Sequence, residues 1–258
     1  EKYLFSLYPN SIYKKIKADP QKKFFNNDYT KTLKAISKDI KSFYEGSIAK
    51  DIVTVVNNSK NSGLLNVDDL KQYFPEKKPA LCKTLKNNYK ICGPNLPSSG
   101  TICIIQALIL YEFYEENLNN NLNDVLEILN FVYSVRDNQL ADPKFANVNI
   151  EKLLNQKYLV KNYEEFKKSN QKFSINNFEE VFSSTSHFSL VDKFSNVLSA
   201  TSSIESSFGS RLFTNGFFLN NQLTDFSFKI IDESGFLIKN RPQAEKKPLS
   251  SMSPLILF

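Results

Sequence analysis

The spacing of apolar residues changes once along this chain, near residue 185, and this change constrains the fold most. Before it, apolar residues recur every three or four positions, the period of an amphipathic helix, as in the stripe Tyr29, Leu33, Ile36, Ile40 and Phe43. After it, Phe188, Leu190 and residues 197–201 have strand character around a turn at residues 192–196. Helices mainly before residue 185 and strands mainly after it predict a layered α+β protein.

Several of the expected helices have clear limits. Residues 48–56 and 102–114 predict helices, and Asn66 is placed to cap another short one. The patterns over residues 102–114 and 122–135 are the strongest, and the second places six apolar residues on one side of its helix. We assign its apolar face to ordinary core packing, and the residues on that face are Leu122, Val125, Leu126, Leu129, Val132 and Tyr133.

Length and composition indicate a folded protein of one or two domains. The chain has 258 residues, 41% of them hydrophobic, and 22 Phe, enough to bury a full core. Its longest apolar stretch, residues 102–111, is interrupted by Gln106 and falls short of the roughly 20 residues that cross a bilayer. We therefore expect no transmembrane segment. The chain starts at Glu1 without a Met and shows no signal peptide.

The net charge of +6 comes almost entirely from Lys residues scattered among Glu and Asp. Only Arg136, Arg211 and Arg241 could supply the bidentate contacts that read guanine or clamp phosphate. This distribution favours a solvated basic surface, so we expect no nucleic-acid partner.

Residues that hold metals and cofactors are sparse. The three Cys form no C-x-x-C pair, and His187 alone cannot build a multi-His site, so we expect no metal. The seven Gly form neither a G-x-G-x-x-G motif nor a P-loop, and no organic cofactor is implied. Cys82 and Cys92 could face each other across a hairpin, either as a disulfide or as free buried thiols.

Short motifs follow one another along both parts of the chain. From residue 185 they read T-S-H-F-S-L-V-D at Thr185, F-G-S at Phe208, L-N-N-Q-L-T-D-F at Leu219 and P-L-S-S-M-S-P at Pro248. Before it they read F-Y-E-G-S-I-A at Phe43, G-L-L at Gly63, P-S-S-G at Pro97 and D-P-K-F at Asp142.

In this order the motifs resemble those of the gamma-glutamyltranspeptidase family, and the resemblance covers nearly the whole chain. It implies part of the αββα sandwich of the N-terminal-nucleophile hydrolases. The family pattern also has an N-terminal region that supplies an Arg for the substrate carboxylate, and a Gly-Gly pair after S-S-M-S-P that stabilises the oxyanion. Neither is found in this sequence, which is therefore expected to be a fragment or a truncated relative.

The resemblance implies that Thr185 is both the cleavage site and the nucleophile. Its hydroxyl attacks the Ser184 carbonyl, and hydrolysis of the resulting ester separates two fragments. Residues 1–184 are then the C-terminal part of the large subunit, and residues 185–258 the N-terminal part of the small subunit, and the fragments stay associated. A Thr hydroxyl needs a nearby base, and the α-amine of a first residue, with a pKa of about 8, can serve.

The remaining catalytic and binding roles are implied position by position. Ser203 stands where the family has a Thr that hydrogen-bonds the amine of the nucleophile, so it joins Thr185 as a catalytic residue. Gln222 and Asp225 fall on positions that hold the substrate's α-ammonium, a charge-assisted contact for the carboxylate. Ser250 and Ser251 fall on the pair that meets its α-carboxylate.

Two polar residues near these motifs have separate interpretations. Glu205 replaces a family Asn at the substrate-binding site, and its negative charge is expected to weaken gamma-glutamyl binding or to change the substrate. His187 is interpreted as structural, or as positioning the cleavage site, rather than as the general base.

The implied enzyme is a gamma-glutamyltransferase or hydrolase that cleaves gamma-glutamyl amides such as glutathione. Water or an acceptor amine then resolves its Thr acyl-enzyme. The alternatives are a related acylase or poly-gamma-glutamate-cleaving enzyme, and an inactive relative with a binding role. Family members are typically outside the cytoplasm, so we expect a periplasmic or secreted protein.

Overall fold

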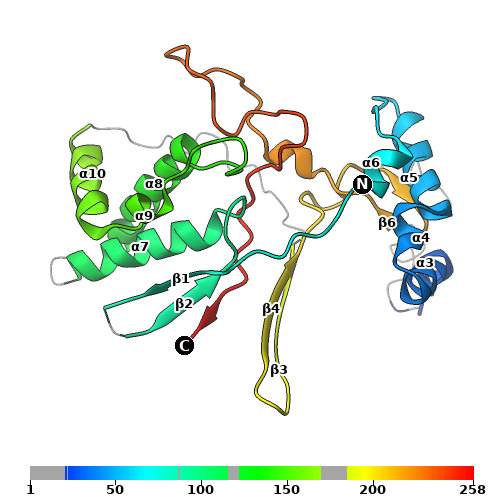
Figure 1. Cartoon of the computed structure of the whole chain (residues 1–258), viewed down its shortest axis with the longest axis horizontal. Helices are drawn as coiled ribbons and strands as arrows, with labels where there is room; N and C mark the ends of the chain where they lie inside the picture. The colour runs from blue at the N-terminus through cyan, green and yellow to red at the C-terminus, as the bar shows by residue number, and fades with distance from the viewer. Residues whose placement is uncertain (1–20, 22, 87, 116–121, 170–184) are drawn as a thin grey trace. The chain divides into compact units, whose positions relative to one another are not determined.

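The computed structural model describes residue 21 and residues 23–86, 88–115, 122–169 and 185–258. These residues belong to two compact units (Figure 1). The described part of the first unit lies within residues 21–76 and 203–221, and that of the second within 77–169, 185–202 and 222–258. Residues after 185 therefore contribute to both units, so the division by packing differs from the division at the predicted cleavage point.

The described part of the first unit contains four helices and a short hairpin. They are α3 (Asn27–Lys38), α4 (Lys41–Tyr44), α5 (Ser47–Asn57), α6 (Val67–Lys71), β5 (Phe213–Thr214) and β6 (Phe217–Phe218). As predicted, Asn66 caps α6, and together with Asp69 it forms a complete capping box. Asn26 caps α3 in the same way by accepting a hydrogen bond from the backbone N–H of Tyr29.

The β5–β6 turn fastens its hairpin to α3. Asn215 and Gly216 have φ values of 50° and 85°, the left-handed pair that a two-residue type I′ turn requires. A Cβ on Gly216 would lie 2.2 Å from the backbone nitrogen of Tyr29, so this approach requires glycine. The Asn26 amide donates to the Gly216 carbonyl, and the Thr32 hydroxyl donates to the Asn215 carbonyl, each over 2.8 Å.

The stripe predicted from Tyr29 to Phe43 does not form one buried face. Asp39 has extended backbone with φ −153°, so the helix ends before it and Phe43 belongs to α4. Ile40, at the break, is 65% exposed. The expectation of one stripe was wrong because it assumed a single continuous helix, whereas the chain leaves the helical conformation at Asp39. The rings of Tyr29 and Phe43 instead contact Phe217, each with centroids 6.3 Å apart.

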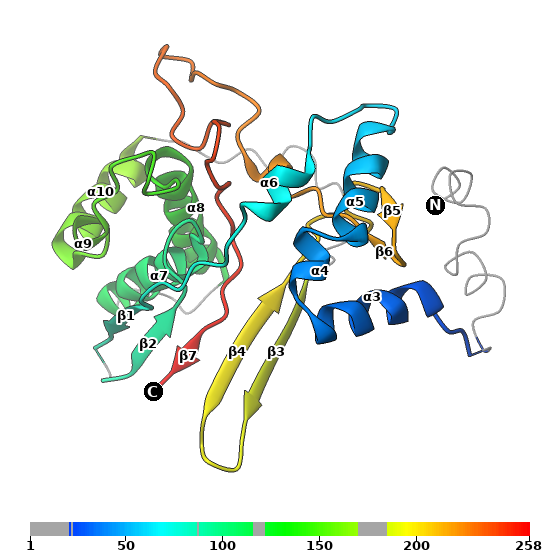
Figure 2. The ribbon, with the colours of Figure 1, turned by 45° about the vertical axis from the view of Figure 1, so that its right-hand side comes forward.

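The second unit contains the larger core, built around a helix that is apolar on all sides. Such a helix is stable in an interior, and α7 (Gly100–Tyr114) lies between a sheet and the other helices (Figures 1 and 2). The sheet is antiparallel with the order β1 (Leu81–Thr84), β2 (Lys90–Gly93), β7 (Ile256–Leu257). The other helices are α8 (Leu122–Gln139), α9 (Ile150–Leu153) and α10 (Gln156–Lys168).

Helix α8 forms where it was expected but buries a different face. Of the residues predicted to face the core, Leu122 and Tyr133 are 71% and 46% exposed, whereas Val132 is buried. The buried residues of α8 are Ile128, Phe131, Val132 and Val135. The prediction chose the side of α8 with the most apolar residues. The side that is buried is instead the one against which α7 and α10 pack.

Of the two states expected for Cys82 and Cys92 in the β1–β2 hairpin, the structure contains the disulfide. Cys82 and Cys92 are directly opposite in the strand register, with Cα atoms 4.2 Å apart, and their sulfurs are bonded. Cys103 is a buried free thiol on α7. Its burial raises the pKa of this thiol to about 11, against the opposing effect of the Arg136 guanidinium.

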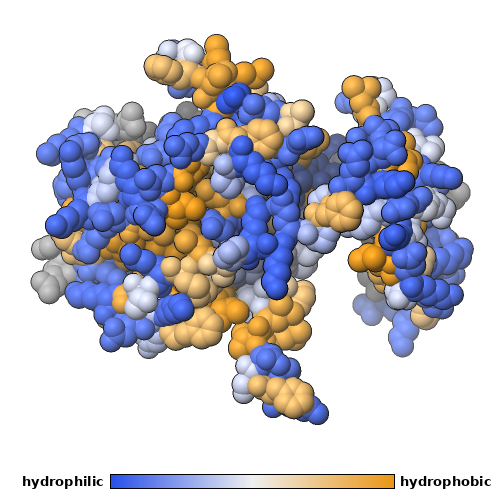
Figure 3. Space-filling model, viewed as in Figure 1, coloured by the Kyte–Doolittle hydropathy of each residue, from blue (hydrophilic) through white to orange (hydrophobic). Residues whose placement is uncertain are grey.

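Apolar side chains also gather on the surface of the second unit (Figure 3). They lie over the hairpin of β3 (Ser186–Val191) and β4 (Val197–Ser202) and over residues 226–238, where Phe228 is 88% exposed and Phe236 71%. Among the described residues, no helix combines the length and the apolar character needed to cross a bilayer.

Candidate functional site

Thr185 stands at the start of an exposed hairpin. It directly precedes β3 (Ser186–Val191), which pairs antiparallel with β4 (Val197–Ser202) along its whole length, as predicted. Thr185 and every residue of β3 are exposed, and the hairpin extends as a long arm in Figure 2. Ser184, the other half of the predicted cleavage site, lies outside the described residues. A nucleophile at Thr185 is thus accessible from solvent.

The turn of this hairpin is built around Asp192. Its carboxylate accepts hydrogen bonds from the side-chain amide and the backbone N–H of Asn196, at 2.8 and 2.9 Å, and from the backbone N–H of Phe194 at 2.8 Å. These bonds hold the pKa of Asp192 below its ordinary value. Ser195 takes the left-handed position, with φ 64°. Because β3 is exposed on both of its faces, the register of the hairpin depends on such a turn.

His187 joins the two strands of the hairpin. Its Nδ1 lies 2.8 Å from Oγ1 of Thr201, the residue opposite in the register, and its Nε2 lies 3.2 Å from Oγ of Ser189. Both ring nitrogens are therefore engaged within the hairpin, two residues after Thr185. This geometry supports the interpretation of His187 as a structural or positioning residue.

Ser203 and Glu205 belong to a polar network in the first unit. The Ser203 hydroxyl accepts a hydrogen bond of 2.9 Å from the backbone N–H of Glu205, which has φ 72°. The Glu205 carboxylate accepts hydrogen bonds from the Ser206 hydroxyl, at 2.7 Å, and from the Asn221 side-chain amide. The Asn221 carbonyl oxygen accepts the backbone N–H of Ser206 at 2.9 Å. The added negative charge of Glu205 is thus paired with donors from its own unit.

Gln222 and Asp225 lie on one short 3-10 helix, η1 (Gln222–Asp225), in the second unit. The Gln222 amide donates a hydrogen bond to the Asp225 carboxylate. The Asn240 amide donates to the Asp225 backbone carbonyl at 2.7 Å, and its own carbonyl oxygen accepts the Leu249 backbone N–H at 3.1 Å. Asn240 thereby ties η1 to the residue immediately before Ser250.

The P-L-S-S segment is fixed to the start of α7. The Ser250 carbonyl accepts hydrogen bonds from the backbone N–H and the hydroxyl of Ser99, at 2.7 and 2.8 Å, and the Ser250 N–H donates to the Pro97 carbonyl at 2.9 Å. A Cβ on Gly100 would lie 1.8 Å from the Ser253 hydroxyl, so the close approach requires glycine. Two motifs that are far apart in the sequence therefore form one local structure.

One guanidinium joins these two motifs. Arg136, on α8, donates from Nε to the Ser99 hydroxyl at 3.0 Å and from Nη2 to the Ser251 hydroxyl at 3.1 Å. Its Nη1 pairs with the Asp137 carboxylate at 2.7 Å, and the Arg136 side chain is only 18% exposed. The sequence motifs do not include Arg136, whose charge was expected to belong to a solvated surface. No local sequence signal predicts this contact, because Arg136 and Ser251 lie 115 positions apart in the sequence.

Comparison with known proteins identifies the family. The family model for gamma-glutamyltranspeptidase matches residues 10–258. The chain belongs to the gamma-glutamyltranspeptidase family. It is 29% identical over 231 residues to the glutathione hydrolase proenzyme of Escherichia coli (strain K12), covering 83% of this chain and 39% of the relative.

A second family relative has a different name. The chain is 29% identical over 239 residues to the capsule biosynthesis protein CapD proenzyme of Bacillus anthracis, covering 89% of this chain and 40% of that protein. The chain thus spans about two fifths of the length of these curated relatives.

The fold agrees with this family. The cephalosporin acylase from Bacillus halodurans matches with a TM-score of 0.70 and 19% identity, over 89% of this chain and 41% of that one. At this identity the likeness shows the fold alone. The prediction of an α+β chain with part of the N-terminal-nucleophile hydrolase fold is confirmed.

The predicted site residues of the gamma-glutamyltranspeptidase family fall in both units. Ser203 and Glu205 belong to the first unit, and the second contains Thr185, Gln222, Asp225, Ser250 and Ser251. Within the second unit, Asn240 connects η1 to the P-L-S-S segment, so the four candidates for holding the substrate's charged groups form one connected group. The roles of all seven residues stay predictions.

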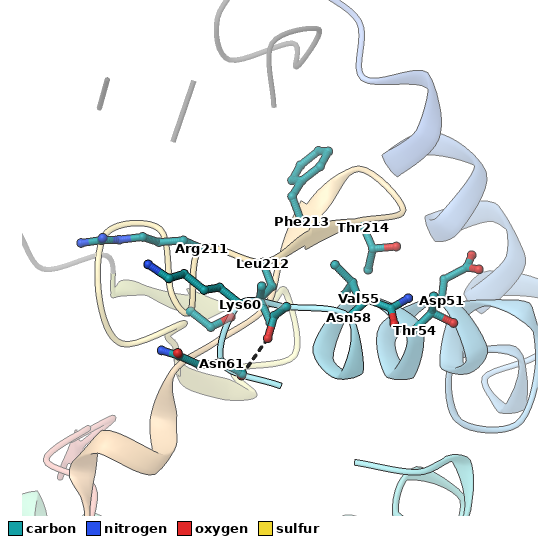
Figure 4. Close-up of a pocket in the computed structure, with 12 residues that line it drawn as sticks. Asp51, Thr54, Val55, Asn58, Lys60, Asn61, Arg211, Leu212, Phe213 and Thr214 are labelled. Carbon is teal, nitrogen blue, oxygen red and sulfur yellow. Dashed lines mark hydrogen bonds between the residues drawn. The ribbon is translucent and has the colours of Figure 1, made fainter. Parts of the chain in front are cut away.

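A separate cavity of about 710 Å³ lies within the first unit (Figure 4). It is lined by α5 and the loop after it on one side and by residues 210–214 on the other. None of the predicted site residues that the structure describes lines it. Asp51, Lys60 and Arg211 give the lining charges of both signs. Within the described ranges, His, Cys, Asp and Glu form no cluster that could hold a metal ion.

Proposed function

We propose that the protein to which this chain belongs cleaves itself between Ser184 and Thr185 and then hydrolyses or transfers gamma-glutamyl groups. The observation that carries the proposal is the family match across the T-S-H-F-S-L-V-D motif, whose first residue, Thr185, is exposed immediately before β3. The name of the Escherichia coli relative, a glutathione hydrolase proenzyme, supports both the substrate class and the cleavage.

The proposed self-cleavage uses one peptide bond and one water molecule. The Thr185 hydroxyl oxygen attacks the Ser184 carbonyl carbon, and the bond from that carbon to the Thr185 nitrogen breaks. An ester and a free α-amine result. Water then hydrolyses the ester, so Ser184 keeps a carboxylate and Thr185 regains its hydroxyl.

The freed amine makes turnover possible. With a pKa of about 8, it can take the hydroxyl proton while the Thr185 oxygen attacks a gamma-glutamyl amide, and it can then protonate the leaving amine. Inside a peptide bond the same nitrogen is an amide and has no basic lone pair. Water or an acceptor amine resolves the acyl-enzyme. Gln222 and Asp225 would hold the α-ammonium of the substrate, and Ser250 and Ser251 its α-carboxylate.

A second candidate function is a related acylase or a poly-gamma-glutamate-cleaving enzyme. The observation that favours it is Glu205, a carboxylate anchored by Ser206 and Asn221 where the family has an Asn. A negative charge at this sequence position disfavours an anionic ligand such as a gamma-glutamyl group, so of these two alternatives it favours the acylase.

We also propose that the protein works outside the cytoplasm. The Cys82–Cys92 disulfide supports this location, because such bonds form and persist in oxidising compartments such as the periplasm and the extracellular space.

The test of the proposed function uses the full-length protein and a gamma-glutamyl anilide. We expect aniline release that increases as pH rises toward about 8, because the α-amine must be deprotonated to act as a base. The Thr185→Ala variant should release none. If the wild-type protein cuts neither itself nor the anilide, it is a non-catalytic relative instead.

A further inference from the structure

We propose that Arg136 is a positioning residue that orients the Ser251 hydroxyl as a hydrogen-bond donor to a bound carboxylate. The inference rests on the proposed function, which brings the substrate's α-carboxylate to Ser250 and Ser251. It adds to that function a residue from α8, which lies 115 positions away from Ser251 in the sequence.

The orientation follows from the chemistry of the two groups. A guanidinium has only donors, whereas a hydroxyl has one donor and two acceptor lone pairs. Because Arg136 Nη2 donates to the Ser251 oxygen at 3.1 Å, the Ser251 proton must point away from the guanidinium. Ser251 is exposed, and the described residues offer this proton no acceptor. The proton is therefore available to an anion from solvent.

The hydroxyl oxygens of Ser250 and Ser99 also accept hydrogen bonds from nearby groups. The Ser250 oxygen accepts the backbone N–H of Met252 at 3.2 Å, which leaves the Ser250 proton to point elsewhere. The Ser99 oxygen accepts from Arg136 Nε at 3.0 Å and donates to the Ser250 carbonyl at 2.8 Å. Arg136 thus holds Ser251 directly, and through Ser99 it also holds the backbone of Ser250.

Arg136 is itself held rigidly enough for this role. Its Nη1 pairs with Asp137, its guanidinium carbon lies 6.0 Å from the centre of the Tyr133 ring, and its side chain is 18% exposed. The Asp137 carboxylate offsets its positive charge. The fork geometry of the guanidinium, which reaches Ser99 and Ser251 from two different nitrogens, therefore matters more than net charge. A lysine donates all its hydrogen bonds from a single nitrogen, so it cannot reproduce this fork.

The experiment is a double-mutant cycle in the full-length processed enzyme, with a gamma-glutamyl anilide as substrate. We expect Arg136→Met and Ser251→Ala each to raise KM about tenfold with kcat little changed, the loss expected for one hydrogen bond to a charged group. The double variant should have the KM of the worse single variant, because the two residues act through one contact. Arg211→Met, which removes an exposed arginine of the first unit, should match the wild type.

Three results would overturn the inference: multiplying effects of the two substitutions, a loss confined to kcat, or a wild-type KM in Arg136→Lys. Arg136→Lys keeps the stem and the charge, so it also serves if Arg136→Met does not fold. If the wild-type enzyme turns over no anilide, the proposed function has failed. Calorimetric titration with L-glutamate then decides this inference alone. Weaker binding in both Arg136→Met and Ser251→Ala than in the wild-type enzyme supports it. Unchanged binding in either variant, or no binding by the wild-type enzyme, contradicts it.

Discussion

At the scale of single residues, Cys103 shows how burial sets chemical reactivity. The thiolate is the reactive form of cysteine, and burial on α7 raises the pKa of Cys103 to about 11 by disfavouring the charged form. We predict that Cys103 of the native protein reacts with a thiol reagent at pH 8 far more slowly than after denaturation. Its rate should continue to rise with pH up to about 11. The absorbance of the released thiol dye measures this, and equal rates in the native and denatured protein would refute it.

His187 is the second residue with a specific expected effect. Because it bridges Thr201 and Ser189 within the hairpin that Thr185 begins, we predict that His187→Ala slows self-cleavage about tenfold, the loss of roughly one hydrogen bond. The appearance of the small fragment over time, followed by gel electrophoresis, measures the rate. Thr201→Val, which removes one of the two partners, should slow cleavage less. Cleavage of His187→Ala at the wild-type rate would show that the bridge has no role in it.

Which residues could be predicted from sequence depended on how local their contacts are. The Asn66 cap was predictable because its partner, Asp69, is three residues away. The contact of Arg136 with Ser251 was not predictable, since it joins two elements that only the tertiary fold brings together. Roles carried over from the family, such as that of Glu205, depend on a resemblance and stay predictions.

At the scale of elements, the β1–β2 hairpin depends on its disulfide. The bond closes a loop with a sequence separation of 10, for which the loss of chain entropy in the unfolded state is worth about 2–3 kcal/mol. We predict that Cys82→Ser/Cys92→Ser lowers the free energy of unfolding by about that amount in chemical denaturation. Reductant should destabilise the wild-type protein and leave the double variant unchanged. An equal response of both proteins to reductant would contradict this account.

Elements also show why helix positions were easier to predict than helix faces. The span of α8 follows from its own sequence, but its buried face follows from α7 and α10. Ile128 and Val135 are therefore buried, while Leu122 is exposed. The break at Asp39 was missed for a related reason, because an apolar period can continue by chance through residues that have left the helix.

At the scale of the whole molecule, each unit contains segments from both sides of the predicted cleavage point. In the second unit β7 pairs with β2, and in the first the β5–β6 turn is hydrogen-bonded to α3. We therefore predict that the two fragments stay together after cleavage. They should elute as one species in native size-exclusion chromatography and separate only in denaturant. Separation of the fragments under native conditions would contradict the prediction.

The most direct test of the central claim is the intact mass and N-terminal sequence of the full-length protein purified without protease. The account predicts a second chain that begins Thr185-Ser186-His187, and a single uncut chain for Thr185→Ala. An uncut Ser184–Thr185 bond in the wild-type protein would contradict it, because Thr185 would then lack the amine that serves as its base.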